Sequence, residues 1–178
     1  LKRMIWPFRR KSKKRIARIV IDEPITSSTR VSVLKALKQI EDREFPALIV
    51  RIDSPGGTVG DSQEIYSAIK RLKDKGCKVI ASFGNISASG GVYIGVASDK
   101  IVANPGTITG SIGVIIRGNN LSELLDKIGI KFETVKSGVF KDILSPDKPL
   151  SEEGRVLLQG LIDESYKQFT EAVAEGRN

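Results

Sequence analysis

The chain alternates between two patterns of hydrophobic positions. Runs of consecutive apolar, often β-branched residues predict buried strands at residues 16–21, 47–52, 77–83 and 100–103. Between the first three runs, apolar residues recur at helical spacing, which predicts one amphipathic helix in each interval. The apolar faces of these two helices comprise Val33, Ala36, Leu37, Ile40, Ile65, Ala68, Ile69 and Leu72. This alternation predicts an α/β fold with a mainly parallel sheet flanked by helices.

The later part of the chain predicts further elements. We expect an apolar helix at residues 91–98, a short helix at 121–128 and a strand at 131–135. Residues 137–149 contain two prolines and predict an irregular segment. A long amphipathic helix is expected to begin at Ser151.

Two glycine-rich loops, at residues 53–60 and 84–91, follow the carboxyl ends of predicted strands. Because these ends meet at one edge of a parallel sheet, where ligands bind, we expect the two loops on the same edge. In the second loop, small residues at a strand-to-helix turn leave backbone N–H groups free. A serine there, Ser87 or Ser89, either caps the helix or acts as a nucleophile beside an oxyanion site. Ser89 directly precedes two glycines and is the stronger candidate.

The net charge of +8 belongs to the N-terminal end, because residues 1–18 carry nine Lys or Arg and no acidic residue. The remaining 20 basic and 21 acidic residues leave the rest nearly neutral. We therefore expect a basic tail at residues 1–15 and one domain at 16–178. Contact of residues 1–18 with an anionic membrane surface is favoured over nucleic acid, since no basic face with interleaved aromatic residues follows. No window reaches the ~20 apolar residues of a transmembrane helix.

The absence of histidine excludes Ser-His-Asp and Cys-His catalysis and every histidine metal site. Cys77 is the only cysteine, so we expect no disulfide framework, no metal and no cofactor. A nucleophilic enzyme then needs a carboxylate or a lysine as its base. Lowering a lysine pKa from about 10.4 to near 7 requires apolar surroundings worth about 4–5 kcal/mol. Lys141 has the most apolar neighbours of any lysine in an irregular segment and is the candidate.

Four motifs lie in order along the chain: Asp-Ser-Pro-Gly-Gly at 53–57, Ser-Ala-Ser-Gly-Gly-Val-Tyr at 87–93, Thr-Gly-Ser-Ile-Gly-Val at 109–114 and Lys-Ser-Gly-Val-Phe-Lys-Asp at 136–142. Together they resemble the signal peptide peptidase A (protease IV) family of serine proteases. The resemblance implies a Clp protease/crotonase-like fold with repeated β-β-α/βα units. It also implies membrane-associated homo-oligomers that use a Ser/Lys dyad on hydrophobic peptides such as cleaved signal peptides.

Each site residue of the family has a counterpart in these motifs. The resemblance implies that Ser89 is the nucleophile and Lys141 the general base. It implies that the N–H groups of Gly57 and Gly90 form the oxyanion hole, and that Ser111 hydrogen-bonds near the lysine amine. An unpaired Asp142 carboxylate beside the base would favour the protonated lysine. We therefore expect that carboxylate to point away from Lys141 or to bond to backbone.

The chain departs from the family pattern at its ends. Against this pattern, we expect residues 1–178 to lack the usual N-terminal transmembrane anchor and the C-terminal end of the domain. We expect a membrane-associated location, otherwise a cytoplasmic one. Two alternative functions stay open: a crotonase-type acyl-CoA enzyme, and a catalytically silent membrane-associated scaffold of the same fold.

Overall fold

The computed structural model describes residues 15–177, so nearly all of the basic tail expected at 1–15 lies outside the described residues. The described residues form two compact units. The first unit comprises residues 15–113 and 169–177, and the second comprises residues 114–168. No helix in this described range is both long enough and apolar enough to span a membrane.

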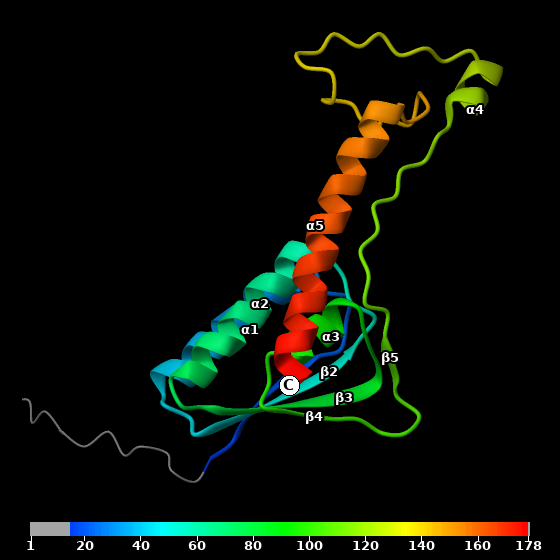
Figure 1. Ribbon diagram of the computed structural model, residues 1–178. Coiled ribbons are helices and arrows are strands. Elements are labelled where there is room, and N and C mark those ends of the chain that lie inside the picture. The colour runs from blue at the N-terminus through cyan, green and yellow to red at the C-terminus, as the bar shows by residue number, and fades with distance from the viewer. Residues whose placement is uncertain (1–14, 178) are drawn as a thin grey trace, which may run out of the picture. The chain divides into compact units, whose positions relative to one another are not determined.

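A five-stranded parallel sheet forms the centre of the first unit (Figure 1). Its strands are β1 (Ala17–Ile21), β2 (Ala47–Ser54), β3 (Lys78–Ala88), β4 (Lys100–Val102) and β5 (Ile108–Gly110). The order is β1-β2-β3-β4, and β5 pairs with the last three residues of β3. Every pairing among these strands is parallel, which confirms the predicted α/β fold with a parallel sheet.

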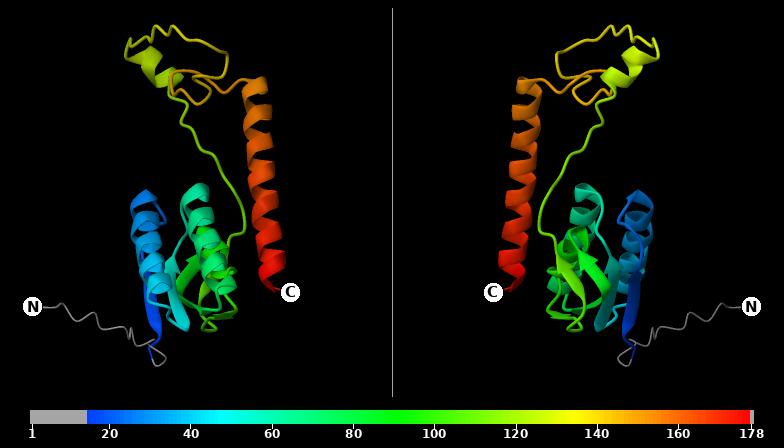
Figure 2. Two further views of the ribbon diagram at one scale, coloured as in Figure 1. Left: turned by 90° about the vertical axis from the view of Figure 1, so that its left-hand side faces the viewer. Right: turned by 90° about the vertical axis from the view of Figure 1, so that its right-hand side faces the viewer.

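Helices cover one face of this sheet. Alternate strand residues point to that face and form the core together with the apolar sides of α1 (Ser27–Asp42), α2 (Val59–Asp74) and α3 (Gly90–Gly95). Figure 2 shows α1 and α2 side by side against the sheet. Three alternate residues of each long strand form the centre of this core: Ala17, Ile19, Ile21, Leu48, Val50, Ile52, Val79, Ala81 and Phe83. Burial on one face explains the period-2 pattern of these strands.

The C-terminal end of α5 (Glu152–Arg177) completes the core of the first unit. The Tyr93 ring lies edge-on between the rings of Tyr66 and Phe169, with centroids 5.0 Å from each. Gly176 also lies close to the residue that caps the C-terminal end of α3, because a Cβ atom there would lie 2.3 Å from the carbonyl oxygen of Val96. The tyrosine of the Ser-Gly-Gly-Val-Tyr motif is therefore a core residue.

The second unit contains α4 (Ser122–Lys127) and the first part of α5, joined by irregular segments. The strand predicted at residues 131–135 was wrong, because this stretch forms no strand in the described structure. Its apolar side chains are exposed: Phe132 is 59% exposed and Val135 fully so. No described strand pairs with the stretch, and unpaired backbone does not form a sheet.

Candidate active site

The loop between β2 and α2 is held by a buried serine and a single bridge. Ser54 Oγ donates a hydrogen bond to the Glu23 carbonyl at 2.7 Å and accepts one from the Gly56 N–H at 3.2 Å. Ile25 bonds to both sides of Gly57, accepting from the Thr58 N–H at 3.0 Å and donating to the Gly56 carbonyl at 2.9 Å. In such a parallel bridge the N–H of the central residue points away from its neighbour. The N–H of Gly57 is therefore left for another acceptor.

Strand β3 is longer than predicted and carries the chain directly to Ser89. Residues 84–88, expected as a loop, form its last part and pair with β5. Asp53 Oδ1 accepts a hydrogen bond from the Ile86 N–H at 3.0 Å. This bond, followed by one from the Asn85 N–H, lowers the pKa of Asp53. A Cβ atom at Gly84 would lie 2.4 Å from the Asp53 carboxyl carbon, so only glycine allows this close approach.

Ser89 forms the turn between β3 and α3 in an uncommon backbone conformation. Its φ is 50° and its ψ is −118°. The Ser89 N–H donates to the Gly110 carbonyl at 2.9 Å, and its carbonyl accepts from the Tyr93 N–H at 3.0 Å. Positive φ at a non-glycine residue costs free energy, and such strain concentrates at functional sites. A strained strand-to-helix turn is also how α/β-hydrolase folds present a nucleophilic serine.

Two glycines allow the β2–α2 loop to contact the Ser89 turn. A Cβ atom at Gly56 would lie 2.7 Å from the Gly90 nitrogen and 2.8 Å from the Ser89 Cβ atom. A Cβ atom at Gly90 would lie 3.3 Å from the Gly57 nitrogen. Because Gly90 is the first residue of α3, its N–H has no acceptor within that helix. Ser89, Gly57 and Gly90 are thus brought together, with two N–H groups beside the half-buried serine.

The other two candidate serines occupy different environments. Ser87 is fully buried, and its hydroxyl has no hydrogen-bond partner among the described residues. Ser111 is exposed, has a φ of 53°, and follows Gly110, the residue whose carbonyl binds the Ser89 N–H. Ser111 is therefore open to solvent and is next in sequence to the residue that binds the Ser89 backbone. Ser87, in contrast, is shielded from solvent. The predicted role of Ser111 toward a lysine stays a prediction.

Lys141 belongs to the second unit and is exposed in a run of turns. Its pairing with Ser89 stays a prediction. The Asp142 carboxylate accepts hydrogen bonds from Lys136 Nζ at 2.6 Å and Lys148 Nζ at 2.5 Å. These two ammonium groups, Lys136 first, lower the pKa of Asp142 to about 2. Two lysine side chains thus bind the carboxylate, which we expected either to point away from Lys141 or to bond to backbone.

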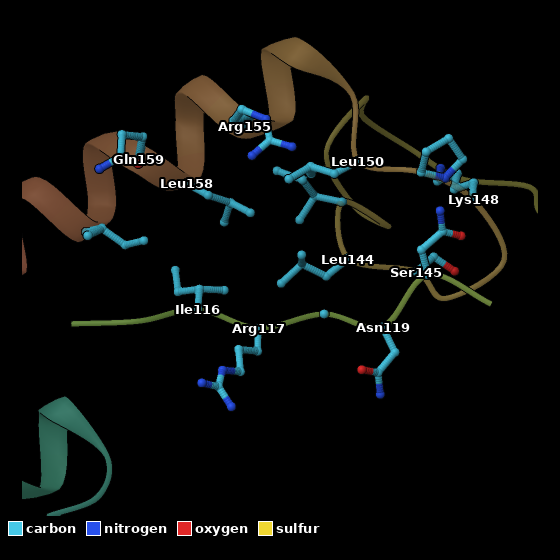
Figure 3. A pocket seen from close by; sticks show the side chains of 15 residues that line it. Ile116, Arg117, Asn119, Leu144, Ser145, Lys148, Leu150, Arg155, Leu158 and Gln159 are labelled. Atoms are coloured by element: carbon cyan, nitrogen blue, oxygen red, sulfur yellow. The ribbon is translucent and has the colours of Figure 1, made fainter. Parts of the chain in front are cut away.

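A cavity of about 510 Å³ opens in the second unit. Figure 3 shows Ile116, Leu144 and Leu158 directed toward its centre, whereas Arg117 and Asn119 point away from it. Within residues 15–177, no three His, Cys, Asp or Glu side chains gather closely enough to hold a metal ion.

Comparisons with known proteins agree with the four motifs. The model of peptidase family S49 matches residues 71–178. A putative protease of Synechocystis is 61% identical over 175 residues, covering 98% of this chain and 63% of the relative. A putative signal peptide peptidase of Enterococcus faecium is 42% identical over 146 residues, covering 82% of this chain and 42% of the relative.

The chain thus spans less than two thirds of the length of each of these relatives. Among solved structures, a mutant of a membrane-bound stomatin-specific protease is 27% identical. It matches 59% of this chain and 49% of its own, with a TM-score of 0.48. The family match covers more than half of the chain and includes Ser89, Gly90, Ser111 and Lys141. The chain belongs to peptidase family S49.

Proposed function

We propose that this chain carries the active region of a serine endopeptidase in which Ser89 is the nucleophile and Lys141 the general base. One observation carries the proposal: a half-buried serine in a strained turn lies beside two backbone N–H groups, those of Gly57 and Gly90, that their surroundings leave free. Membership of peptidase family S49 supports the same chemistry.

In the proposed mechanism, neutral Lys141 accepts the proton of Ser89 Oγ while this oxygen attacks the peptide carbonyl carbon. The N–H groups of Gly57 and Gly90 stabilise the negative charge that develops on the carbonyl oxygen. Lys141 then protonates the leaving amine, and an acyl-enzyme ester forms at Ser89. In the second half, Lys141 accepts a proton from the water that attacks the ester, and it returns this proton to Ser89 Oγ as the C–O bond breaks and the acid leaves. Ser111 would orient the Lys141 amine.

The start of α2 adds to the proposed oxyanion site. This helix begins two residues after Gly57, and the positive end of its dipole favours negative charge nearby. Preorganised donors of this kind are worth about 10²–10³-fold in rate each. The short loop between β2 and α2 therefore supplies both a donor and a favourable field.

The proposed substrates are hydrophobic peptides, such as cleaved signal peptides, at a membrane. A relative named as a signal peptide peptidase supports this substrate class. We extend the proposal to a homo-oligomer, because the second unit exposes many large apolar side chains that a second copy would cover. They include Ile115, Leu124, Ile128, Phe132, Val135, Val139, Val156 and Leu161.

Hydrolysis of a fluorogenic apolar peptide by the purified protein tests the proposal. We expect Ser89→Ala and Lys141→Ala to abolish turnover, whereas Ser67→Ala and Lys127→Ala, at exposed helical positions, retain it. Turnover that persists in Ser89→Ala refutes the proposed nucleophile. Hydrolysis of an acyl-CoA thioester that is unaffected by Ser89→Ala would instead support a crotonase-type enzyme. A wild-type protein inactive in both assays would support the silent scaffold.

A further inference from the structure

The loop that carries Lys141 is closed by a cluster of three charged side chains, which we call the Asp142 clamp: Lys136, Asp142 and Lys148. Lys136 lies six positions before Asp142, and Lys148 lies six positions after it. Each ammonium binds a different oxygen of the carboxylate, at 2.6 Å and 2.5 Å. Lys136 Nζ also donates to the Val139 carbonyl at 3.1 Å. The clamp therefore ties together both ends of the segment around the proposed base.

Backbone hydrogen bonds show that the clamp closes an ordered series of turns. The Ile143 N–H donates to the Phe140 carbonyl at 3.2 Å, and the Ser145 N–H donates to the Asp142 carbonyl at 3.0 Å. Lys141 lies inside the first of these turns and directly precedes Asp142. The Asp142 side chain is 18% exposed, and those of Lys136 and Lys148 are 32% and 40% exposed. Rotation of Asp142 would release Lys148 and the end of the loop.

We propose that Asp142 is a positioning residue, which fixes the loop that presents Lys141 and whose charge is offset by Lys136 and Lys148. This inference rests on the proposed Ser89 and Lys141 chemistry and extends it to a residue outside the reacting groups. A carboxylate next to a catalytic lysine favours the protonated, inactive form of that lysine. With two ammonium groups bound, the clamp carries a net charge of +1, which opposes that protonation.

The charge argument gives opposite predictions for the two kinds of clamp residue. Asp142→Asn removes the negative charge and leaves both cations, so the acidic limb of the activity profile should move to lower pH. Lys148→Met leaves the carboxylate less offset, so the same limb should move to higher pH. Other charged groups of this unit that lie near the clamp are Asp147, bound by Ser145, and two arginines that line the same cavity as Lys148, Arg117 and Arg155.

The test measures kcat, KM and the pH profile of peptide hydrolysis for five variants of the purified protein: Asp142→Asn, Asp142→Glu, Lys148→Met, Lys148→Arg and Asp42→Asn. The last is the matched control, because it removes the same charge from an exposed ion pair with Lys38 on α1. We expect Asp142→Asn to lower kcat roughly 10–100-fold, with KM nearly unchanged, because misplacement of a catalytic group acts on turnover. Asp142→Glu and Lys148→Arg keep the charge of the residue that they replace. They should therefore lose less activity than Asp142→Asn and Lys148→Met, respectively.

Two results would overturn the proposed role of the clamp. In the first, Asp142→Asn has the same kcat and the same pH profile as Asp42→Asn. In the second, the acidic limbs of Asp142→Asn and Lys148→Met do not move in opposite directions. If Asp142→Asn does not fold, the acidic limb of the pH profile measured in the two Lys148 variants still tests the proposal. Wild-type turnover that does not require Ser89 would refute the proposed function itself. Wild-type turnover that requires both Ser89 and Lys141 but is indifferent to Asp142 would refute only the clamp.

Discussion

Gly56 is the residue at which the contact between the β2–α2 loop and the Ser89 turn can be tested most sharply. Its φ is 101°, and an added Cβ atom would lie 2.8 Å from the Ser89 Cβ atom and 2.7 Å from the Gly90 nitrogen. Gly56→Ala therefore combines backbone strain with a collision. The collision would push the Gly57 N–H away from the nucleophile.

The two contributions can be separated in size. Gly76, after α2, has a φ of 89°, and a Cβ atom there would meet no atom within 4 Å. Gly76→Ala therefore adds only backbone strain, which lowers the unfolding free energy by about 1–2 kcal/mol. The stiffer unfolded chain of the alanine variant offsets roughly 0.4–1 kcal/mol of this loss. Overpacking adds about 1–3 kcal/mol at Gly56. We expect a loss of unfolding free energy of about 1 kcal/mol for Gly76→Ala and about 2–4 kcal/mol for Gly56→Ala.

Urea unfolding gives these free energies, and the rate of Ser89 labelling by a fluorophosphonate gives the functional effect. Labelling should fall at least tenfold in folded Gly56→Ala, because one oxyanion donor is displaced, and should stay unchanged in Gly76→Ala. Equal destabilisation of the two variants, together with equal labelling, would show that the loop does not contact the Ser89 turn as described.

Three further predictions follow from the first unit. Ser87→Ala should keep full labelling and lose no stability, measured by urea unfolding, because the buried Ser87 hydroxyl has no partner to lose; a labelling defect would contradict the choice of Ser89. Phe169→Ala should lower the unfolding free energy by about 3–5 kcal/mol, since Phe169 is 4% exposed against Tyr93, and a loss below 1 kcal/mol would contradict the packing of α5. Asp53 has a lowered pKa, so its stabilisation is present above the unfolded value of about 3.9 and is lost as pH falls through the lower folded value. Asp53→Asn should therefore show a weaker acid-induced loss in thermal melts than the wild type, and equal losses would refute this.

The regular part of the sheet could be predicted from the sequence, because its strands are runs of apolar, often β-branched residues. Ile19 and Val50 belong to two of these runs, and both lie in the core. The end of β3 could not be predicted in this way. Gly84 and Ser87 have weak strand propensity, and the strand is set there by distant partners, the Asp53 carboxylate and β5.

The candidate site, like the sheet, could be predicted from the sequence only in part. The position of Ser89 before two glycines indicated a turn with free N–H groups, and the structure has that turn. The positive φ of Ser89 and the buried Ser54 that holds the β2–α2 loop had no local signal in the sequence. The strand expected at residues 131–135 was wrong because apolar alternation alone does not supply a partner strand. The ion pairs of Asp142 depend on lysines six positions away, and charge spacing in an irregular segment does not predict them.

The central claim is that Ser89 is the residue that reacts, and mass-spectrometric mapping of a fluorophosphonate adduct tests it directly. We predict a single adduct on Ser89, none on Ser87 or Ser111, no labelling of Ser89→Ala and strongly slowed labelling of Lys141→Ala. An adduct on another serine, or labelling that survives in Ser89→Ala, would contradict the claim.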